Sequence, residues 1–327
     1  LHMGNAFYYV ERQVFTVILG TAAMLLMMKL DYHRLLKMAL PLYGLSLFLL
    51  AAVFVVGTAS HGQKRWIYIG SIGFQPSEFA KFVLIIFLAS ICGAAGSMMK
   101  KWKGILLVFL WMMPAAGMVM VTNLSTGIII MGIAFIIIFT ASRQWLPFFV
   151  LMGLGGGFMG VFLKLASYRV GRIEAWLNVE THPKGYQTRQ SLYAIGSGGL
   201  FGRGYGKSIQ KLAYIPEAHN DMIFSVICEE WGLLGAGIIA ALFIFLIWRC
   251  LITANSASDI QGALLTMGVT AHLGLQMLIN IAVVTNSIPN TGIPLPFISY
   301  GGTSLIFLMC EIGIVQNIAQ QGKTYIS

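Results

Sequence analysis

Residues 222–248 of the chain, MIFSVICEEWGLLGAGIIAALFIFLIW, form one long apolar run in which only Glu229 and Glu230 carry charge. A helix needs about 20 residues to cross the roughly 30 Å hydrocarbon core of a bilayer, and this run is longer than that. In lipid, the backbone N–H and C=O groups must be satisfied within the protein, as they are in a helix. The stretch therefore predicts a membrane-spanning helix.

The composition of the whole chain agrees with this reading. Of its 327 residues 57% are hydrophobic and only 10% are charged, with a mean hydropathy of +0.80, whereas a soluble domain usually carries about 25% charge. These values exclude an ordinary soluble domain. Further apolar runs of spanning length lie at 13–30, 38–59, 78–96, 104–122, 125–141, 145–166, 261–285 and 303–319. We therefore expect an all-α polytopic membrane protein with about nine transmembrane helices, built as a single integral membrane domain over residues 1–327.

The positive charge fits a membrane protein better than a nucleic-acid-binding one. The chain has 21 Lys and Arg against 11 Asp and Glu, a formal net charge of +10. Cytoplasmic loops favour Lys and Arg, and lipid headgroups are anionic, so we expect membrane lipid and no nucleic acid as a partner. Alternate connections group Arg34, Lys37, Lys100, Lys101, Lys103, Arg143, Arg249 and Lys323 on one side, against Arg12, Lys64 and Arg65 on the other. The positive-inside rule then predicts a cytoplasmic C-terminus and an extracytoplasmic 167–221 loop.

Two patterns that suggest a cofactor fail on spacing. The stretch GSGGLFGRGYGKS (196–208) ends like a P-loop, but the first glycine of that motif would have to stand where Phe201 is. The four cysteines have neither metal-ligand nor redox spacing. We interpret the glycines as backbone flexibility at the membrane surface and the cysteines as packing residues.

A pair of opposite charges opens the third predicted span. Glu78 and Lys81 stand three residues apart in FQPSEFAK (74–81) and so share one face of a helix. Ionisable groups at the mouth of a span are costly unless they pair or serve a site. A structural ion pair and a functional pair both remain open on this pattern.

A carboxylate also stands where the outer loop meets the membrane. Asp221 closes the segment PEAHND (216–221) and leads directly into the span at 222–248. It is either a helix N-cap, a role that Asp fills well, or a functional acid. We expect the glutamates within the spans, Glu229, Glu230 and Glu311, to form structural pairs.

The connection IPNTGIPLPFISYGGTS (288–304) carries no charge. Its three prolines and three glycines oppose a regular helix. Irregular backbone at membrane depth survives only where it is buried in protein or lines a water-filled cavity. We expect a re-entrant loop beside a site, with a simple tight turn as the alternative.

Four stretches taken together resemble the SEDS family of bacterial shape, elongation, division and sporulation proteins, of FtsW/RodA type. They are RWIYIGSIGFQPSEFAK (65–81), YQTRQSLYAIGSGGLFGRGYGKSIQK (186–211), PEAHNDMIFSVICEEWGLLGAG (216–237) and NTGIPLPFISYGGTS (290–304). The family has ten transmembrane helices, and the resemblance aligns this chain from the second onward. It implies polymerisation of lipid II into peptidoglycan glycan strands with a class B penicillin-binding protein as partner. The segment 285–292 favours a cell-division or sporulation member, acting with division or elongation proteins in the bacterial plasma membrane.

The resemblance also implies roles for individual residues. Asp221 matches the family's catalytic aspartate, a general base on the outer face of the membrane, and Glu78 and Lys81 match its supporting ion pair. Cations stabilise developing phosphate charge, so Arg189 and several other polar residues are candidates for binding substrate or pyrophosphate. These other candidates are Arg65, Arg169, Arg172, Gln187, Lys207, Lys211, Glu217, His219 and Ser299.

Relatives often have an acidic residue in a QPDLGT-like string, where this chain has TNLST (122–126). That difference removes a carboxylate from consideration there. The family chemistry leaves open a divalent cation, Mg²⁺ or Mn²⁺, at the leaving group, but the sequence has no ligand cluster for it. We therefore assign no metal-binding residue.

Two other classes of function stay open. A lipid II flippase would also have many helices with internal charges and broken segments, although no inverted repeat is visible in the sequence. A non-catalytic scaffold of the division machinery would tolerate replacement of Asp221, whereas a synthase would not.

Overall fold

The computed structural model describes residues 8–60, 63–70, 72–142 and 167–324, with isolated positions 144, 145, 149 and 153 between the last two ranges. The chain divides into two compact units, each described here by itself. The first comprises residues 1–144, 247–273 and 301–327, and the second comprises residues 145–246 and 274–300.

Within the described residues, eight helices are long and apolar enough to cross a membrane. They are α1 (Tyr8–Lys29), α3 (Ala39–Val56), α4 (Pro76–Ala95), α5 (Trp102–Thr122), α6 (Leu124–Ser142), α11 (Ile223–Asn255), α12 (Ile260–Val284) and α13 (Gly302–Thr324). The predicted polytopic all-α fold is confirmed in this part of the chain. The expected span at 145–166 lies outside the described residues, apart from three isolated positions.

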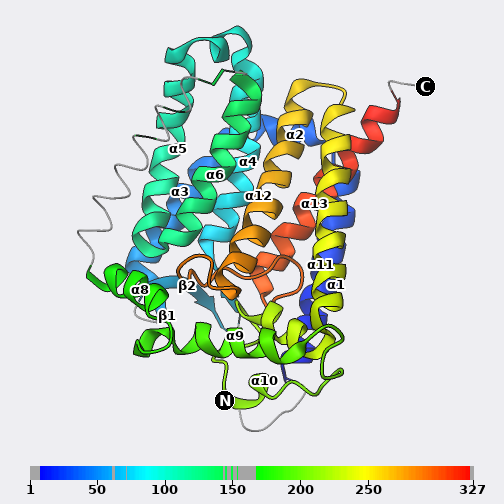
Figure 1. The fold of residues 1–327 in the computed structure, drawn as a ribbon. Helices are drawn as coiled ribbons and strands as arrows, with labels where there is room; N and C mark the ends of the chain where they lie inside the picture. The colour runs from blue at the N-terminus through cyan, green and yellow to red at the C-terminus, as the bar shows by residue number, and fades with distance from the viewer. Residues whose placement is uncertain are drawn as a thin grey trace. The chain divides into compact units, whose positions relative to one another are not determined.

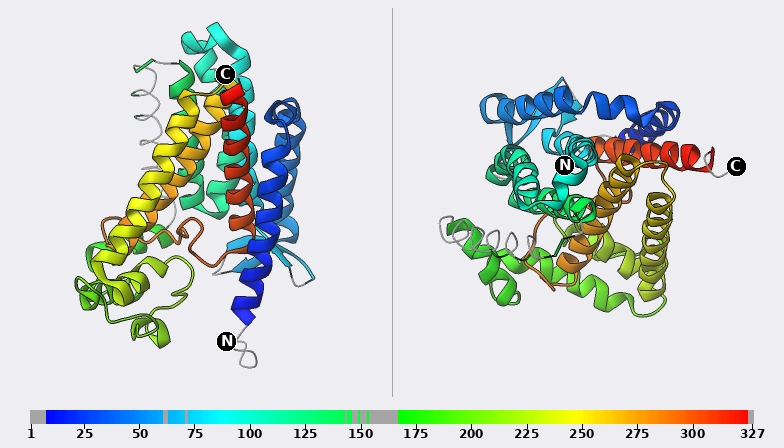
Figure 2. Two further views of the ribbon diagram at one scale, coloured as in Figure 1. Left: turned by 90° about the vertical axis from the view of Figure 1, so that its right-hand side faces the viewer. Right: turned by 90° about the horizontal axis from the view of Figure 1, so that it is seen from above.

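The first unit is a helical bundle with α4 at its centre. Residues 83–89 of α4 are almost fully buried, because this part of the helix is apolar on every face and the helix packs against α3, α5 and α6. Helices α1 and α13 pack along each other, as Figures 1 and 2 show in blue and red. The short helix α2 (Tyr32–Lys37) contacts α3, α4 and α13, and the 3-10 helix η1 (Gly96–Lys100) contacts α4, α5 and α6.

A small antiparallel sheet, which the sequence reading did not predict, follows α3. Its strands are β1 (Thr58–Ser60), β2 (Gln63–Ile69) and β3 (Ile72–Phe74), in the order β1-β2-β3. Trp66 pairs with Thr58, and Ile67 pairs with Phe74. The sheet carries Arg65 on β2 and leads into α4.

The second unit contains α8 (Ser167–Leu177), η2 (Pro183–Gly185), α9 (Tyr186–Gly198), α10 (Gln210–Ala213), the first part of α11 and the irregular segment after α12. Helix α9 lies within the stretch 186–211 that carries the family resemblance. Helix α11 is broken at Gly232, which has φ +66° and ψ −166°. Beyond the break, the amides of Leu233 and Leu234 donate to the carbonyls of Gly199 and Leu200, so the glycine-rich loop satisfies the interrupted backbone.

Candidate functional site

Asp221 lies two residues before α11, in a short turn that closes the 167–221 loop. Gln187, near the start of α9, donates its side-chain amide to Asp221 Oδ1 over 3.3 Å and to the carbonyl of Pro216 over 3.2 Å. Gly292 faces the other carboxylate oxygen, since a Cβ added there would lie 3.8 Å from Asp221 Oδ2. The carboxylate is thus held between α9 and the irregular segment after α12.

The backbone of Asp221 is fixed by a buried amide on α12. Asn280 is 0% exposed, and its Nδ2 donates to the carbonyls of both Asp221 and Ile293, each over 2.8 Å. One side chain therefore ties the start of α11 to the segment after α12. Loss of the Asn280 side chain would leave the carbonyls of Asp221 and Ile293 without this donor, and a buried carbonyl without a hydrogen bond is destabilising.

Ser299 makes a second tie between the same segments. Its hydroxyl donates to the carbonyl of Asn220 over 2.6 Å and accepts from the amide of Leu295 over 2.7 Å. The amide of Tyr300 donates to the carbonyl of His219 over 2.8 Å. These bonds give the predicted substrate residue Ser299 a structural role, and its contact with substrate stays a prediction.

His219 is part of the wall beside Asp221. Its ring stands edge-on to Tyr300, with 5.6 Å between ring centroids. Burial lowers the pKa of His219, against the opposing charge of Glu217. Glu217 adopts a left-handed φ of +51° and accepts from the side-chain amide of Asn220 over 2.9 Å. The lowered pKa favours the neutral ring of His219 near neutral pH, and a neutral imidazole has one donor and one acceptor nitrogen.

Several predicted cations lie in the second unit. Arg172 on α8 donates to the backbone carbonyl of Asn290 over 3.2 Å. Arg189 donates to the carbonyl of Glu180 and lies 5.7 Å from the centroid of the Tyr186 ring. The position of Arg169 falls in α8, but its side chain lies outside the described part of the structure.

Lys207 lies on the glycine-rich loop (196–208) and Lys211 lies on α10, and two glutamates of α11 bind this region. Lys211 Nζ lies 2.5 Å from Glu230 Oε1, and Lys207 is exposed. Glu230 accepts from the amides of Gly206 and Ser208, and Glu229 accepts from the Ser208 hydroxyl over 2.5 Å. The expected structural pairing of these glutamates is confirmed.

The glycines of this loop adopt backbone conformations that other residues rarely do. Gly199, Gly202, Gly204 and Gly206 all have positive φ. Carboxylates of α11 bind this segment in the structure, and its flexibility stays a prediction.

Glu78 and Lys81 belong to the first unit. Lys81 Nζ lies 3.0 Å from Glu78 Oε1, and their side chains are only 2% and 7% exposed respectively. Ser304 of α13 also hydrogen-bonds to Glu78. His272 of α12 contacts Glu311 of α13 over 2.9 Å, as expected for a glutamate that forms a structural pair within a span. The supporting role of Glu78 and Lys81 in catalysis stays a prediction.

Arg65 also lies in the first unit, on β2. Its Nε donates to the carbonyl of Thr122, at the end of α5, over 3.0 Å. The side chain lines a small hollow together with Leu50, Val53, Ser77, Met118 and Thr122. Asn123 caps α6 by accepting from the amide of Thr126, so the TNLST stretch forms a helix junction.

The sequence reading missed three polar residues that shape the site. Asn280 and Gln276 stand one helical turn apart on α12, and Gln276 donates to the carbonyl of Pro294 over 3.0 Å. Two side-chain amides four residues apart in an apolar span could have predicted a polar contact surface on this helix, because buried polar groups need hydrogen-bond partners. Asn290 lay within a recognised stretch but was given no role. Among the described residues, no three His, Cys, Asp or Glu side chains gather as a metal-ligand set.

Comparison with known proteins gives consistent matches. A family model described as a cell cycle protein of FtsW/RodA/SpoVE type matches residues 1–324. Stage V sporulation protein E of Bacillus subtilis (strain 168) is 37% identical, over 98% of this chain and 89% of the relative. A probable peptidoglycan glycosyltransferase FtsW of Geobacter sp. (strain M18) is 36% identical, over 96% of this chain and 88% of the relative.

Solved structures agree with these matches. A chain from a study of how a peptidoglycan synthase complex coordinates polymerization and crosslinking has a TM-score of 0.82 and 29% identity, covering 96% of this chain and 90% of that one. The rod shape determining protein RodA of Thermus thermophilus has a TM-score of 0.69 and 28% identity, covering 95% of this chain and 87% of that one.

Proposed function

Because the chain belongs to the FtsW/RodA/SpoVE family of cell cycle proteins, we propose that it is a peptidoglycan glycosyltransferase that polymerises lipid II into glycan strands. The relatives named as glycosyltransferases cover nearly the whole chain. The comparisons include a sporulation protein, FtsW proteins and RodA. The 285–292 segment favours a division or sporulation member, and of these we propose a role in cell division.

In the proposed reaction, Asp221 acts as the general base. The 4-hydroxyl of one lipid-linked disaccharide attacks the anomeric carbon of another, and the carboxylate of Asp221 takes the hydroxyl proton. The bond from the anomeric carbon to the pyrophosphate oxygen breaks, so undecaprenyl pyrophosphate leaves and the configuration inverts. A pyrophosphate whose charge is countered is a good leaving group, so the second carboxylate of a glycoside hydrolase is not needed.

The observation that carries this proposal is the way Asp221 is held. Gln187 orients its carboxylate and Asn280 fixes its backbone, while the residue itself is only partly buried. A helix N-cap would not require such support from two distant elements. The arrangement resembles that of a catalytic group locked by its neighbours.

Cations of the same unit would counter the charge of the leaving group. Arg172 on α8 and Lys207 on the glycine-rich loop are exposed, and Arg172 also donates to the carbonyl of Asn290. Lys211 is paired with Glu230, whose carboxylate balances its charge. Guanidinium and ammonium groups both bind pyrophosphate oxygens well. We assign the contact to Arg172 and Lys207 first. Should a Mg²⁺ or Mn²⁺ ion assist, pyrophosphate oxygens would supply most of its ligands.

We further propose an outward-facing site, a cytoplasmic C-terminus and a class B penicillin-binding protein as the crosslinking partner. The similar chain from a peptidoglycan synthase complex supports the partner. The orientation rests on the charge of the connections. Within the first unit, the α1–α2 and α11–α12 connections and the end of α13 meet through hydrogen bonds, as the alternation of spans requires.

The proposal is tested by reconstituting the full chain with its penicillin-binding partner in vesicles that contain fluorescent lipid II. A glycosyltransferase converts lipid II into long, muramidase-sensitive strands. Movement of lipid II between leaflets without polymer would instead indicate a flippase. If the partner is bound but lipid II is neither polymerised nor moved between leaflets, the chain is a scaffold.

A further inference from the structure

A line of hydrogen bonds in the second unit ends on Asp221. The amide of Gly292 donates to Asn290 Oδ1 over 3.0 Å, and Asn290 Nδ2 donates to Gln187 Oε1 over 3.1 Å. Gln187 Nε2 then donates to Asp221 Oδ1 over 3.3 Å. The line thus joins the irregular segment after α12 to α9 and on to the start of α11.

Backbone groups at both ends fix the direction of this line. A backbone N–H can only donate, so Gly292 requires the oxygen of the Asn290 amide to face it, and the nitrogen of Asn290 then faces Gln187. At the other end, the carbonyl of Pro216 can only accept, so it requires the nitrogen of the Gln187 amide. The same nitrogen faces Asp221. The donor to the carboxylate is therefore set by the fold and not by a free choice of amide orientation.

The elements that carry Gln187 and Asn290 are themselves anchored. Helix α9 is tied to the end of α12 by Ser191, whose buried hydroxyl donates to the carbonyl of Val284 over 3.0 Å. Trp176 and Arg172 of α8 donate to the carbonyls of Asn286 and Asn290. Both amides therefore have little freedom to turn away from Asp221.

From this geometry we infer that Gln187 and Asn290 are positioning residues for the general base. A hydrogen bond donated to a carboxylate favours its ionised form, which is the form that accepts a proton. It also fixes the rotation of the carboxylate, so that Oδ2 faces Gly292. This inference rests on the proposed function of Asp221, and it changes the expected role of Gln187 from substrate contact to support of the base.

The test compares two glutamines of one helix. Gln187→Met removes the donor to Asp221, whereas Gln190→Met makes the same change three residues later, where the structure shows no bond to Asp221. Lipid II polymerisation by the full chain with its partner is measured as kcat, KM and a pH profile. For Gln187→Met we expect kcat to fall roughly 10- to 100-fold, the loss that matches one hydrogen bond to a charged group. The acid limb of the profile should move to higher pH while KM changes little.

Each other outcome decides against the inference or against its premise. An unchanged acid limb with a raised KM would make Gln187 a substrate contact, and an unchanged kcat would overturn its role altogether. Asn290→Leu removes the donor to Gln187 without touching Asp221, so it should shift the limb in the same direction by a smaller amount. Full activity of Asp221→Asn would refute the role of Asp221 as the general base, which is the premise of this inference, whatever the Gln187 variants do.

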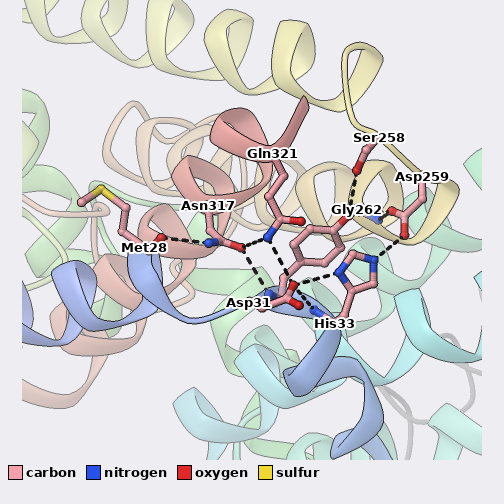
Figure 3. Close-up of polar contacts among 9 residues, drawn as sticks. Met28, Asp31, His33, Ser258, Asp259, Gly262, Asn317 and Gln321 are labelled. Atoms are coloured by element: carbon pink, nitrogen blue, oxygen red, sulfur yellow. Dashed lines mark hydrogen bonds and ion pairs between the residues drawn. The ribbon is translucent and has the colours of Figure 1, made fainter. Parts of the chain in front are cut away.

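A second, independent cluster of polar side chains lies in the first unit, where the α1–α2 connection meets the start of α12 (Figure 3). His33 Nδ1 lies 2.8 Å from Asp31 Oδ1, and His33 Nε2 lies 2.9 Å from Asp259 Oδ2. A histidine donates from both ring nitrogens only when it is protonated. The cluster therefore fits an imidazolium held between two carboxylates.

Other elements complete the surroundings of His33. Tyr32 stacks on its ring and donates to Asp259 Oδ1 over 3.0 Å. The amides Gln321 and Asn317 of α13 bind Asp31 and the backbone of Tyr32, and Ser90 of α4 binds the backbone of α2. Among the described residues, the charged groups whose hydrogen bonds reach the ring are Asp31 from its own connection and Asp259 from α12.

We infer that His33 forms a proton-dependent latch between α2 and the start of α12. Burial works against the charged ring, but the hydrogen bonds to Asp31 and Asp259 outweigh it and raise the pKa of His33. A raised folded-state pKa gives a contribution that is fully present below the unfolded value of about 6.5 and is lost as the pH rises through the folded value. The latch thus releases as the pH rises above the ordinary pKa of histidine.

The latch is tested by thermal unfolding of the detergent-solubilised full chain between pH 5.5 and 8.5. His33→Gln should lower Tm by a few degrees at pH 6, and the difference from wild type should shrink as the pH rises. Asp259→Asn keeps an oxygen that accepts from the amide of Gly262 at the start of α12, so this variant removes only the charge. It should also reduce the dependence of Tm on pH. Parallel curves for wild type and both variants would overturn the latch.

Discussion

Lys81 Nζ and Glu78 Oε1 lie 3.0 Å apart on one face of α4, and both side chains are almost completely buried. Two charges at this depth persist because each compensates the other and because Ser304 supplies a further hydrogen bond to the carboxylate. The pair therefore behaves as a unit, whichever part it plays in catalysis.

Replacing one member of this ion pair should destabilise the chain more than replacing both members together. We expect Glu78→Gln or Lys81→Met alone to destabilise the chain by about 3–5 kcal/mol, because each leaves one buried charge without its counterion. The double variant should recover part of that loss. Unfolding in a graded denaturant series measures all three, and equal damage from the single and double variants would refute the idea of a coupled pair.

The break in α11 at Gly232 makes a second prediction. A Cβ at Gly232 would lie 2.4 Å from both the amide nitrogen of Gly202 and the carbonyl oxygen of Leu200, and φ is +66°. Gly232→Ala should therefore lower the free energy of unfolding by more than the roughly 1–3 kcal/mol that a strained backbone conformation costs by itself.

Gly237 is the matched control, because it lies in the same helix and a Cβ there meets nothing within 4 Å. Gly237→Ala should be neutral or stabilise the helix by about 0.5–1 kcal/mol. Folded yield and Tm of the two variants check this contrast. Similar behaviour of both would show that the close contact of Gly232 with the loop is absent.

The glycine-rich loop should depend on its carboxylate anchor. Glu230→Gln removes the charge that binds Lys211 and weakens acceptance from the amides of Gly206 and Ser208, so those amides should exchange hydrogen faster, by roughly 10-fold or more. Glu180→Gln, at an exposed position before α9, should leave their exchange unchanged. Mass-spectrometric hydrogen exchange of the segment 203–211 measures both. Unaltered protection in Glu230→Gln would mean that the loop is held by other contacts.

The spans could be predicted from sequence because hydropathy is a local property. The runs that became α3, α5 and α12 needed no knowledge of their neighbours, and their predicted limits lie within a few residues of the helices. The sheet at 58–74 could not be predicted in this way. Its strands β1 and β3 are only three residues long, and their pairing with β2 depends on a fold that brings them together.

The roles of the site residues stay predictions, and the contacts that surround Asp221 could not be predicted from the sequence. Asp221 was recognised from its position at the mouth of a span, but its support comes from Gln187, 34 residues earlier, and from Asn280, 59 residues later. No spacing rule connects positions so far apart. Ser299 and Lys211 likewise were assigned to substrate by type, and only the structure shows that both already bind protein groups.

The most direct test of the account is lipid II polymerisation by Asp221→Asn. Asn keeps the size and a hydrogen-bond acceptor for Gln187, but it cannot take a proton from the attacking hydroxyl. Asp259→Asn, the same change outside the site, is the control and should polymerise as the wild type does. We expect Asp221→Asn to bind its partner, fold normally and form glycan strands at least 100-fold more slowly, as loss of a general base implies. Polymerisation by Asp221→Asn at the wild-type rate would contradict the central claim.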